Sequence, residues 1–196
     1  MAAKVQDFNP TKTALSEAMK ALLSEHPLDD IRISDITSRC GLSRKSFYLY
    51  FRDKYDLVQW IFDTEFLLKI DFEKIERTID YHRALCEYLY ENRAFYSHAL
   101  QNKGQNSFSE YLSQLMMPLL IDHYNMERVC GEYMQECSEG IVDGFINFLT
   151  RWLTDWPYIK PEQFVALIYK NAFNISHFLL QDTVPGKFEH LKKLQG

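Results

Sequence analysis

The sequence predicts an all-α fold, in which a three-helix helix-turn-helix head stands on a larger helical-bundle body. The 196 residues contain only seven glycines and six prolines, which favours helices with short connections over a turn-rich β architecture. Apolar residues recur every three or four positions through most of the chain, which is the period of an amphipathic helix. We place the head in residues 1–53 and the regulatory and dimerisation body in residues 54–196.

Charge is divided unevenly along the chain, whose formal net charge is -5. Residues 1–55 hold nine Lys or Arg against seven Asp or Glu, whereas the remaining residues hold 13 against 20. A slightly basic head on an acidic body suits a protein that binds nucleic acid at one end. The four cysteines lack CxxC spacing, and no apolar run approaches about 18 residues. We therefore expect a cytoplasmic protein with reduced thiols, no metal, no cofactor and no membrane span.

The first helix of the head is expected to begin at Pro10, because proline suits the first helical position and Asn9 is a good cap. Pro27 ends it after His26.

The helix-turn-helix follows between Ile33 and Asp56. Ser34 is a preferred N-cap residue, so we expect a short helix over residues 36–40. Gly41 tolerates the left-handed conformation that ends such a helix, and Ser43 caps a second helix that begins near residue 44.

The second helix of this motif has two distinct faces. Phe47 and Phe51 lie four residues apart on one face, which we expect to be buried. The opposite face is free to enter a DNA major groove. Its outward residues are Lys45, Ser46 and Leu49. Asp53 then caps a third helix that begins at Lys54.

Four short segments at fixed offsets run through this region: Gly41-Leu42-Ser43, Ser46-Phe47-Tyr48, Tyr50-Phe51, and Lys54 before Asp56-Leu57. Together they resemble the DNA-binding domain of tetracycline-repressor-type regulators. The likeness covers roughly the first third of the chain, and the rest is similar only in helical layout. The body, around Gln105-Asn106-Ser107-Phe108 and Tyr111-Leu112, looks somewhat like the branch that includes regulators of dihydroxyacetone kinase genes.

The resemblance implies DNA contacts along the motif. In that family, DNA is approached by the residues equivalent to Arg44, Lys45, Ser46, Tyr48, Leu49, Tyr50 and Lys54. Further candidates in the same motif are Ser34, Thr37 and Ser43. We expect Lys45, Ser46 and Leu49 to set base preference, and Tyr48, Tyr50 and Lys54 to hold phosphates. Thr37 stands where a small apolar residue is usual and Leu49 where many members are polar, so the preferred bases stay open.

The body is expected to begin with a long helix over residues 54–72, because its apolar residues keep to one stripe over several turns. Further helices are expected from Asp80, from Asn92 and from Ser107, where Glu110 completes a capping-box pattern. The resemblance implies an effector chamber among these helices. Our candidates for its lining are Phe62, Phe66, Tyr88, Phe95, Phe108, Tyr111 and Phe145. The alternative is that these rings are ordinary core residues.

The last two long helices, over residues 133–156 and 161–179, carry more apolar surface than one stripe, which indicates a partner subunit. Gly140 and Gly144 each cost about 1 kcal/mol within a helix relative to Ala. Close approach of a neighbouring helix, from the same chain or from a second subunit, would explain them. The candidates for a homodimer interface are Gly140, Gly144, Phe148, Trp152, Phe164, Ile168 and Ile175.

These features indicate a sequence-specific DNA-binding transcription regulator, a repressor by the family resemblance. Its affinity for a double-stranded operator would be controlled by a small-molecule effector or a partner protein. An enzyme is not indicated, because the sequence has no nucleophile elbow, glycine-rich phosphate loop or paired His-Glu motif. The competing hypothesis is a helical protein-interaction adaptor, which would lack salt-dependent affinity for DNA.

Overall fold

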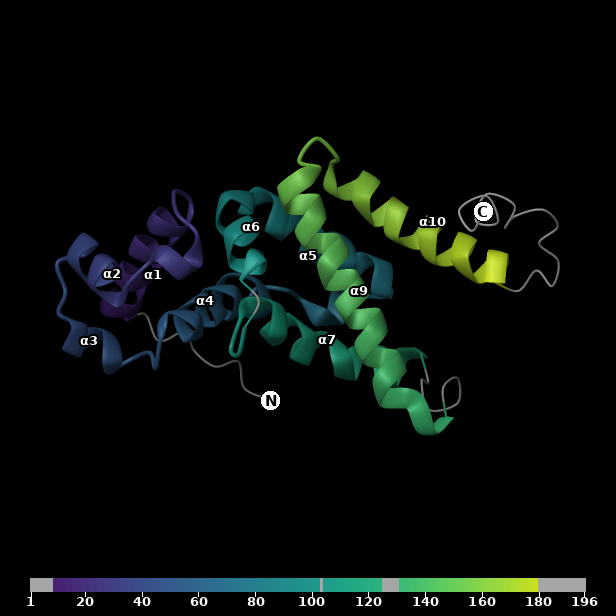
Figure 1. Ribbon diagram of the computed structural model, residues 1–196, viewed down its shortest axis with the longest axis horizontal. Helices are drawn as coiled ribbons and strands as arrows, with labels where there is room; N and C mark the ends of the chain where they lie inside the picture. Colours follow the sequence, from purple (N-terminus) through teal and green to yellow (C-terminus); the bar gives the residue numbers. More distant parts are fainter. Residues whose placement is uncertain (1–8, 103, 125–130, 180–196) are drawn as a thin grey trace, which may run out of the picture.

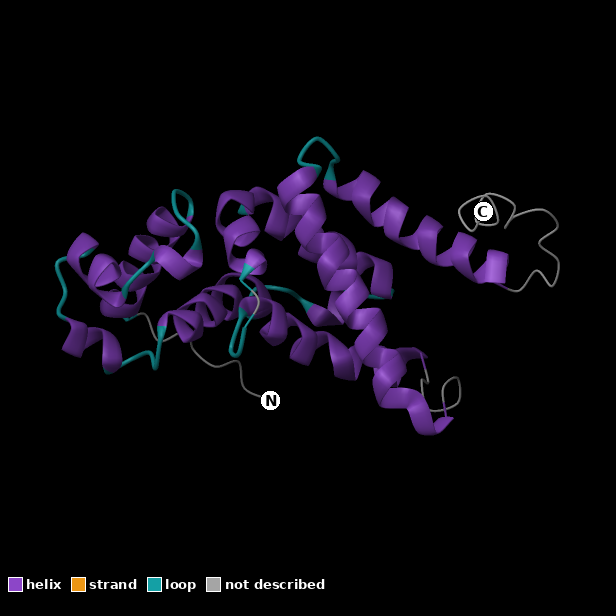
Figure 2. Cartoon of the chain, in the orientation of Figure 1, coloured by secondary structure: helices purple, strands orange, loops and turns teal. Residues whose placement is uncertain are grey.

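The computed structural model describes residues 9–102, 104–124 and 131–179, and this part of the chain consists of helices and loops without a strand (Figure 2). The head comprises α1 (Pro10–Leu23), α2 (Ile33–Arg39) and α3 (Arg44–Tyr48). From it α4 (Lys54–Phe62) leads into the body (Figure 1). The body comprises α5 (Thr78–Glu91), α6 (Arg93–Gln101), α7 (Phe108–Tyr124), α9 (Met134–Asp155) and α10 (Pro161–Leu179). The all-α fold class is confirmed.

One hydrophobic core runs through the head, α4 and the body. Leu15 of α1, Phe47 of α3 and Leu57 of α4 are fully buried in the same cluster as Leu89 of α5. Because the core is continuous, burial alone does not mark a boundary at residue 53. The division of the chain into residues 1–53 and 54–196 stays a prediction.

The first helix begins as predicted. The side chain of Asn9 accepts hydrogen bonds from the N–H groups of Thr11 and Lys12 at 3.0 and 3.2 Å, and Pro10 takes the first helical position. The helix ends at Leu23, before the expected end at His26. There the N–H of His26 bonds to the carbonyl of Leu22 at 2.9 Å, so the chain closes into a tight turn ahead of the next segment.

The start of α2 differs from the prediction. The helix begins at Ile33. Its N-terminus is capped by Asp35, whose carboxylate accepts a hydrogen bond from the N–H of Arg32 at 2.8 Å. Ser34 therefore lies inside the first turn, and its prediction as the N-cap is wrong. The Asp35 carboxylate caps the helix in place of the serine, because a carboxylate accepts a stronger hydrogen bond than a hydroxyl and is also attracted to the positive end of the helix.

The long helix predicted over residues 54–72 is also wrong in its second half. The α-helix ends at Phe62 and continues as a π-helical turn over Asp63–Leu67, in which the N–H of Leu68 bonds to the carbonyl of Asp63 at 2.9 Å. The wider turn shifts the helical register, so that Phe66 stays buried whereas Leu68 is 60% exposed. A 3-10 turn follows at Phe72–Lys74.

The body helices pack in two pairs. The long helix α9 packs along α7, and α10 packs against α5, so that α9 and α10 diverge from the turn that joins them (Figure 1). Ser107 caps α7, because its hydroxyl accepts a hydrogen bond from the N–H of Glu110 at 3.2 Å, as the capping-box pattern predicted. Among the described residues, no helix is long and apolar enough to cross a membrane.

Candidate DNA-binding surface

The turn between α2 and α3 requires glycine. Gly41 has φ +68°, in the left-handed region, and the N–H of Leu42 closes the end of α2 by bonding to the carbonyl of Thr37 at 2.9 Å. A side chain at this position would be strained by its own backbone. The turn is therefore tight, and it fixes the start of α3 relative to α2 as the sequence predicted.

Two serines set the first turn of α3. The hydroxyl of Ser43 accepts a hydrogen bond from the N–H of Ser46 at 3.1 Å, and the two hydroxyl oxygens lie 2.9 Å apart. Ser43 is thus the predicted N-cap. Because both hydroxyls serve the cap, contacts that these side chains make to DNA use their remaining lone pairs or protons.

The inner and outer faces of α3 are separated as predicted. Phe47 and Phe51 are buried, and their ring centroids lie 5.7 Å apart. On the outer face, Tyr48 is 51% exposed and Leu49 is 71% exposed. Burying one face holds the helix rigidly while it leaves the other free for DNA.

The charged side chains at the start of α3 complete this outer face. Arg44 and Lys45 are exposed, and neither forms an ion pair with any described residue. Tyr50 is half-buried against the core. The exposed cations and the phenol of Tyr48 are suited to bind phosphate oxygens and base edges. We define the α3 outer face as Arg44, Lys45, Ser46, Tyr48 and Leu49.

Thr37 does not belong to this surface. Its side chain is 3% exposed, and its hydroxyl donates a hydrogen bond to the carbonyl of Ser34 at 3.2 Å. Ser34 itself is half-buried, near the side chain of Asp35. The family's usual small apolar residue is here replaced by a threonine that packs inward and satisfies its hydroxyl within α2. We therefore correct the prediction that Thr37 contacts DNA.

Lys54 also differs from the prediction. Its Nζ lies 2.6 Å from the carbonyl oxygen of Leu28, 3.0 Å from that of Ile31 and 3.2 Å from that of Asp29. Burial lowers the pKa of Lys54, and the carboxylates of Asp29, Asp30 and Asp53 oppose this effect. The ammonium thus fastens the turn between α1 and α2 to the start of α4.

The backbone at the start of α4 is occupied in the same way. The Asp53 carboxylate accepts hydrogen bonds from the N–H groups of Tyr55 and Asp56 at 2.9 and 2.8 Å, which confirms Asp53 as the cap. These two N–H groups and the Lys54 ammonium all have partners within the chain. The structure therefore corrects the expectation that Lys54 is free to hold a phosphate.

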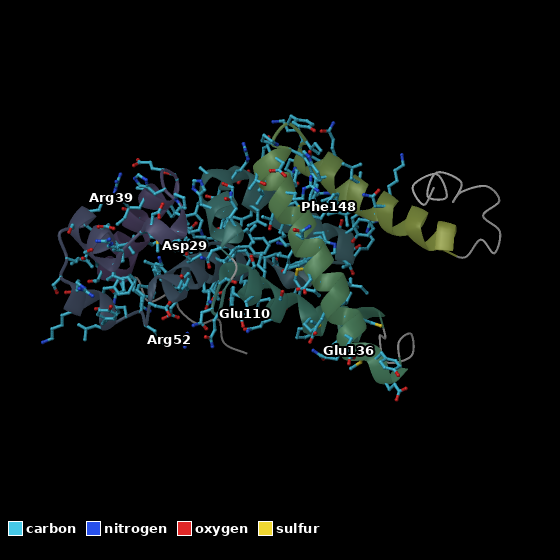
Figure 3. All side chains as sticks on the ribbon, viewed as in Figure 1. Asp29, Arg39, Arg52, Glu110, Glu136 and Phe148 are labelled. Carbon is cyan, nitrogen blue, oxygen red and sulfur yellow. The ribbon has the colours of Figure 1, made fainter. Side chains whose placement is uncertain are left out.

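Two exposed arginines of the head were not predicted. Figure 3 labels Arg39 and Arg52 on opposite edges of the head. Arg39 lies 3.8 Å from Glu25, and Arg52 pairs with Asp56 at 3.1 Å. The hydrogen bond that Arg52 donates to the Asp56 carboxylate raises the pKa of Arg52. Arg39 is the last residue of α2, and Arg52 lies in the turn between α3 and α4; proximity to a helix end is the only signal in the sequence that pointed to them.

The predicted effector chamber is filled by its own rings. Phe62 contacts Phe66 and Phe108 with centroid separations of 5.2 and 5.3 Å, and all three are buried. Phe95, Tyr88 and Tyr111 belong to the same packed region, together with Tyr96, which was not predicted. Phe145 lies apart and stacks on His82 at 5.4 Å. These side chains form an aromatic core, so the alternative reading of them as core residues describes this structure better.

A groove lies elsewhere, between α7 and α9. It has a volume of 1120 Å³, and none of the predicted rings lines it. Its lining includes the carboxylates of Glu110, Glu139 and Asp143, and none of the described residues that line it is a lysine or arginine. A smaller polar cavity of 210 Å³, lined in part by Tyr111, lies where the start of α4 approaches α7.

The predicted dimer residues fall into two groups. Trp152 and Phe164 are fully buried within one chain, where their rings stack at 4.2 Å, so their assignment to an interface is wrong. Phe148 and Ile168 are half-buried. In Figure 3, Phe148 lies toward the end of α9 that leads to α10, and Glu136 lies toward the other end. The side chain of Ile175 is outside the described residues.

The two glycines of α9 meet no partner helix within the part of the chain that the structure describes. Both are exposed, and a Cβ added at Gly140 or Gly144 would meet nothing within 4 Å. Close packing inside the monomer therefore does not explain them, at least among the described residues. The explanation by a second subunit stays a prediction.

The fold and the α3 outer face together define a helix-turn-helix regulatory protein. Two family models match the chain: bacterial regulatory proteins of the tetR family over residues 15–61, and a transcriptional regulator C-terminal region over residues 76–174. The chain belongs to the tetR family of bacterial regulatory proteins. Members of this family are regulators rather than enzymes, and they bind DNA and typically form dimers.

Individual relatives agree with this assignment. The HTH-type dhaKLM operon transcriptional activator DhaS of Lactococcus lactis subsp. lactis (strain IL1403) is 32% identical over 92 residues, which cover 44% of this chain and 46% of the relative. The uncharacterized HTH-type transcriptional regulator YxbF of Bacillus subtilis (strain 168) is 23% identical over 196 residues, 92% of this chain and 50% of the relative. The chain thus spans about half the length of these curated relatives.

A solved structure shares the fold. The dihydroxyacetone kinase operon activator DhaS superposes with a TM-score of 0.51 at 19% sequence identity, over 83% of this chain and 96% of that one. The similarity expected between the body and the dihydroxyacetone kinase regulator branch is confirmed by these relatives.

Proposed function

We propose that this protein is a transcription regulator that binds double-stranded operator DNA as a homodimer, through the α3 outer face of each subunit. The observation that carries the proposal is the contrast within α3, whose capped start and buried Phe47 hold it rigidly while Lys45 and Leu49 remain exposed. Lys45, Ser46 and Leu49 set base preference, and Arg44, Tyr48 and Tyr50 hold phosphates.

The test begins with selection of bound fragments from random DNA, followed by titration of a selected fragment at several salt concentrations. We expect enriched half-sites related by two-fold symmetry, with an affinity that falls steeply as salt rises. Arg44→Ala should weaken binding to all sequences and lower the salt slope by about one unit. An unselective pool and an affinity independent of salt would instead favour the protein-interaction adaptor.

Dimerisation is supported by the outer side of α9. Gly140 and Gly144 are exposed there, and Ile141 is 50% exposed beside them. Small residues four apart let a second helix approach closely, and an exposed isoleucine gains by burial against it. We revise the proposed interface to Gly140, Ile141, Gly144 and Phe148, with Ile168 of α10 at its edge. Light scattering at micromolar concentration tests it, and a monomer would refute it.

Control of operator affinity is assigned to a ligand or partner protein in the groove between α7 and α9. The described lining holds three carboxylates and neither lysine nor arginine, which favours an uncharged or cationic ligand over an anion. Hydroxyl and amide side chains, such as those of Ser113, Gln114 and Asn147, offer further hydrogen bonds. Calorimetric titration of candidate ligands into wild type and Asp143→Asn tests this site, and equal binding by both would contradict it.

The sign of the regulation depends on where the operator lies relative to the promoter. The family resemblance alone suggests repression. The relative from Lactococcus lactis is named an activator, which favours activation. A reporter gene that carries the selected operator distinguishes the two, because expression rises with the protein in one case and falls in the other. A cytoplasmic location stays a prediction.

A further inference from the structure

Among the described residues, one ion pair joins the head to a distant segment of the chain, and the other pair across the boundary, Arg52 with Asp56, is local in sequence. Nζ of Lys20, on α1, lies 2.8 Å from Oε1 and 2.9 Å from Oε2 of Glu65, in the π-helical turn after α4. All other ion pairs in the described part join residues close in sequence or lie within the head. The Lys20–Glu65 pair therefore spans the junction between the DNA-binding head and the body.

Glu65 is also connected to two body helices. The hydroxyl of Tyr88, on α5, donates a hydrogen bond to Oε2 of Glu65 at 3.2 Å, and the hydroxyls of Tyr88 and Tyr96, on α6, lie 2.7 Å apart. Each hydroxyl carries one proton, so Tyr96 must donate to Tyr88 while Tyr88 donates to Glu65. Burial raises the pKa of both tyrosines, which keeps them protonated. One carboxylate thus connects α1, α5 and α6.

The element that carries Glu65 is a π-helical turn over Asp63–Leu67. A π-helical turn holds one residue more than an α-helical turn, and such turns frequently occur at functional sites. Conversion of this turn to α-helix would rotate the residues after it by about 100° relative to α4. Glu65 would then leave Lys20. The ion pair and the hydrogen bond from the Tyr88 hydroxyl hold Glu65 in place at the junction while the turn is π-helical.

Other contacts keep the head attached when this pair is broken. Nδ1 of His98, on α6, lies 2.5 Å from the carbonyl oxygen of Leu23, and Asn102 donates a hydrogen bond to the carboxylate of Asp29. Buried side chains of α1 and α4 also share one core. Loss of the Lys20–Glu65 pair should therefore change the orientation of the head without unfolding it.

We propose that Lys20, Glu65 and Tyr88 are positioning residues for DNA binding. They fix the angle between the head and the body, and hence the placement of α3 in each half-site of an operator. None of them lies on the α3 outer face. The inference rests on the proposed function, because it requires that the head binds operator DNA.

The experiment compares wild type, Lys20→Met, Glu65→Gln, the double variant, and the exchanged pair Lys20→Glu with Glu65→Lys. Affinity for the selected operator is measured by fluorescence anisotropy at one salt concentration, and folding is followed by thermal denaturation. The matched control is Lys74→Met, which removes a lysine that pairs with Asp71 at 2.8 Å within one local turn. The control should bind the operator within about twofold of wild type.

We expect each single variant to lose about 5- to 20-fold in operator affinity, within the range of typical coupling between sites. The double variant should lose no more than the singles, and the exchanged pair should recover at least half of the loss on a logarithmic scale. Glu65→Gln is the most informative variant, because removal of a negative charge would by itself strengthen binding to DNA. A loss in this variant therefore reports position rather than long-range charge.

Three outcomes would overturn the inference. Unchanged or stronger operator binding by Glu65→Gln would show that only long-range charge matters. Additive losses in the double variant would show that the two residues act separately. A lower melting temperature with unchanged affinity of the folded protein would show a structural role alone. If wild type itself selects no operator, the proposed function fails, which is a different result from a wild type that binds and variants that bind equally well.

Discussion

Replacing Lys54 with methionine separates the two roles that this residue can have. The substitution keeps the aliphatic part of the side chain and removes the ammonium that three carbonyl oxygens bind, at 2.6, 3.0 and 3.2 Å. Hydrogen bonds to charged groups contribute about 1.5–3 kcal/mol each when buried. Because Lys54 is half-buried and water reaches the vacated carbonyls, we place the total loss of stability at about 2 kcal/mol.

Thermal and denaturant unfolding measure this loss. For a chain of this length, about 2 kcal/mol corresponds to a decrease in melting temperature of roughly 4–8 °C. The matched control is Lys45→Met, which removes an exposed ammonium of α3. The control should keep the stability of wild type and lose affinity for the operator, whereas Lys54→Met should do the reverse when affinity is measured on folded protein at low temperature.

The opposite pattern would refute the structural role of Lys54. If Lys54→Met melts within about 1 °C of wild type and lowers the salt slope of DNA binding by about one unit, its ammonium binds a phosphate. The three carbonyl contacts would then be a state of the free protein that DNA displaces.

Three further substitutions probe α9 and the π-helical turn. Gly144→Ala should stabilise the protein by up to about 1 kcal/mol, since the added Cβ meets nothing within 4 Å. Gly144→Trp should raise the dissociation constant of the dimer, measured by sedimentation, at least tenfold. Equal dissociation constants for the two variants would contradict the interface. Burial raises the pKa of Asp63 above its ordinary value of 3.8, so its contribution to stability is present in acid and is lost as pH rises through the folded pKa. The side chain of Asp63→Asn cannot ionise, so the stability of this variant relative to wild type should rise between about pH 4 and neutrality, by less than about 1 kcal/mol after solvent screening. A stability difference that shrinks with rising pH in denaturant unfolding would contradict this assignment.

The sequence predicted the local structure of the head well, because short-range signals determine it. Asn9, Ser43 and Asp53 are caps in the structure, and Gly41 has the positive φ that its position in the turn required. In each case the residue acts on backbone groups within a few positions of itself. The prediction of Ser34 as a cap was wrong, because the neighbouring carboxylate of Asp35 caps the helix instead.

Contacts between segments that are distant in sequence could not be predicted from such short-range signals. The apolar stripe after Lys54 gave no sign that a π-helical turn interrupts it. The side chains that contact Glu65 in this turn, Lys20 and Tyr88, are far away in sequence. The ammonium of Lys54 has partners 23 to 26 residues away, which no spacing rule indicates.

The same limit applies to buried aromatic side chains. Trp152 and Phe62 have the residue type and periodicity of an interface or a pocket, and these do not distinguish either from a core position. Only the packing of the rings against each other, at 4.2 Å for Trp152 and Phe164, decides between them. Residue type alone therefore predicts that such a side chain is buried and leaves open what buries it.

The most direct test of the central claim is to transfer base preference with a single residue of the α3 outer face. Selection from random DNA is performed with wild type and with Leu49→Asn, a change at a position where the leucine is 71% exposed. An asparagine favours adenine, whereas leucine offers an apolar contact to a thymine methyl group. We predict that the selected base changes at one position in each half-site and that the other positions and the half-site spacing stay the same. Identical selected sites for the two proteins would contradict recognition of DNA by α3.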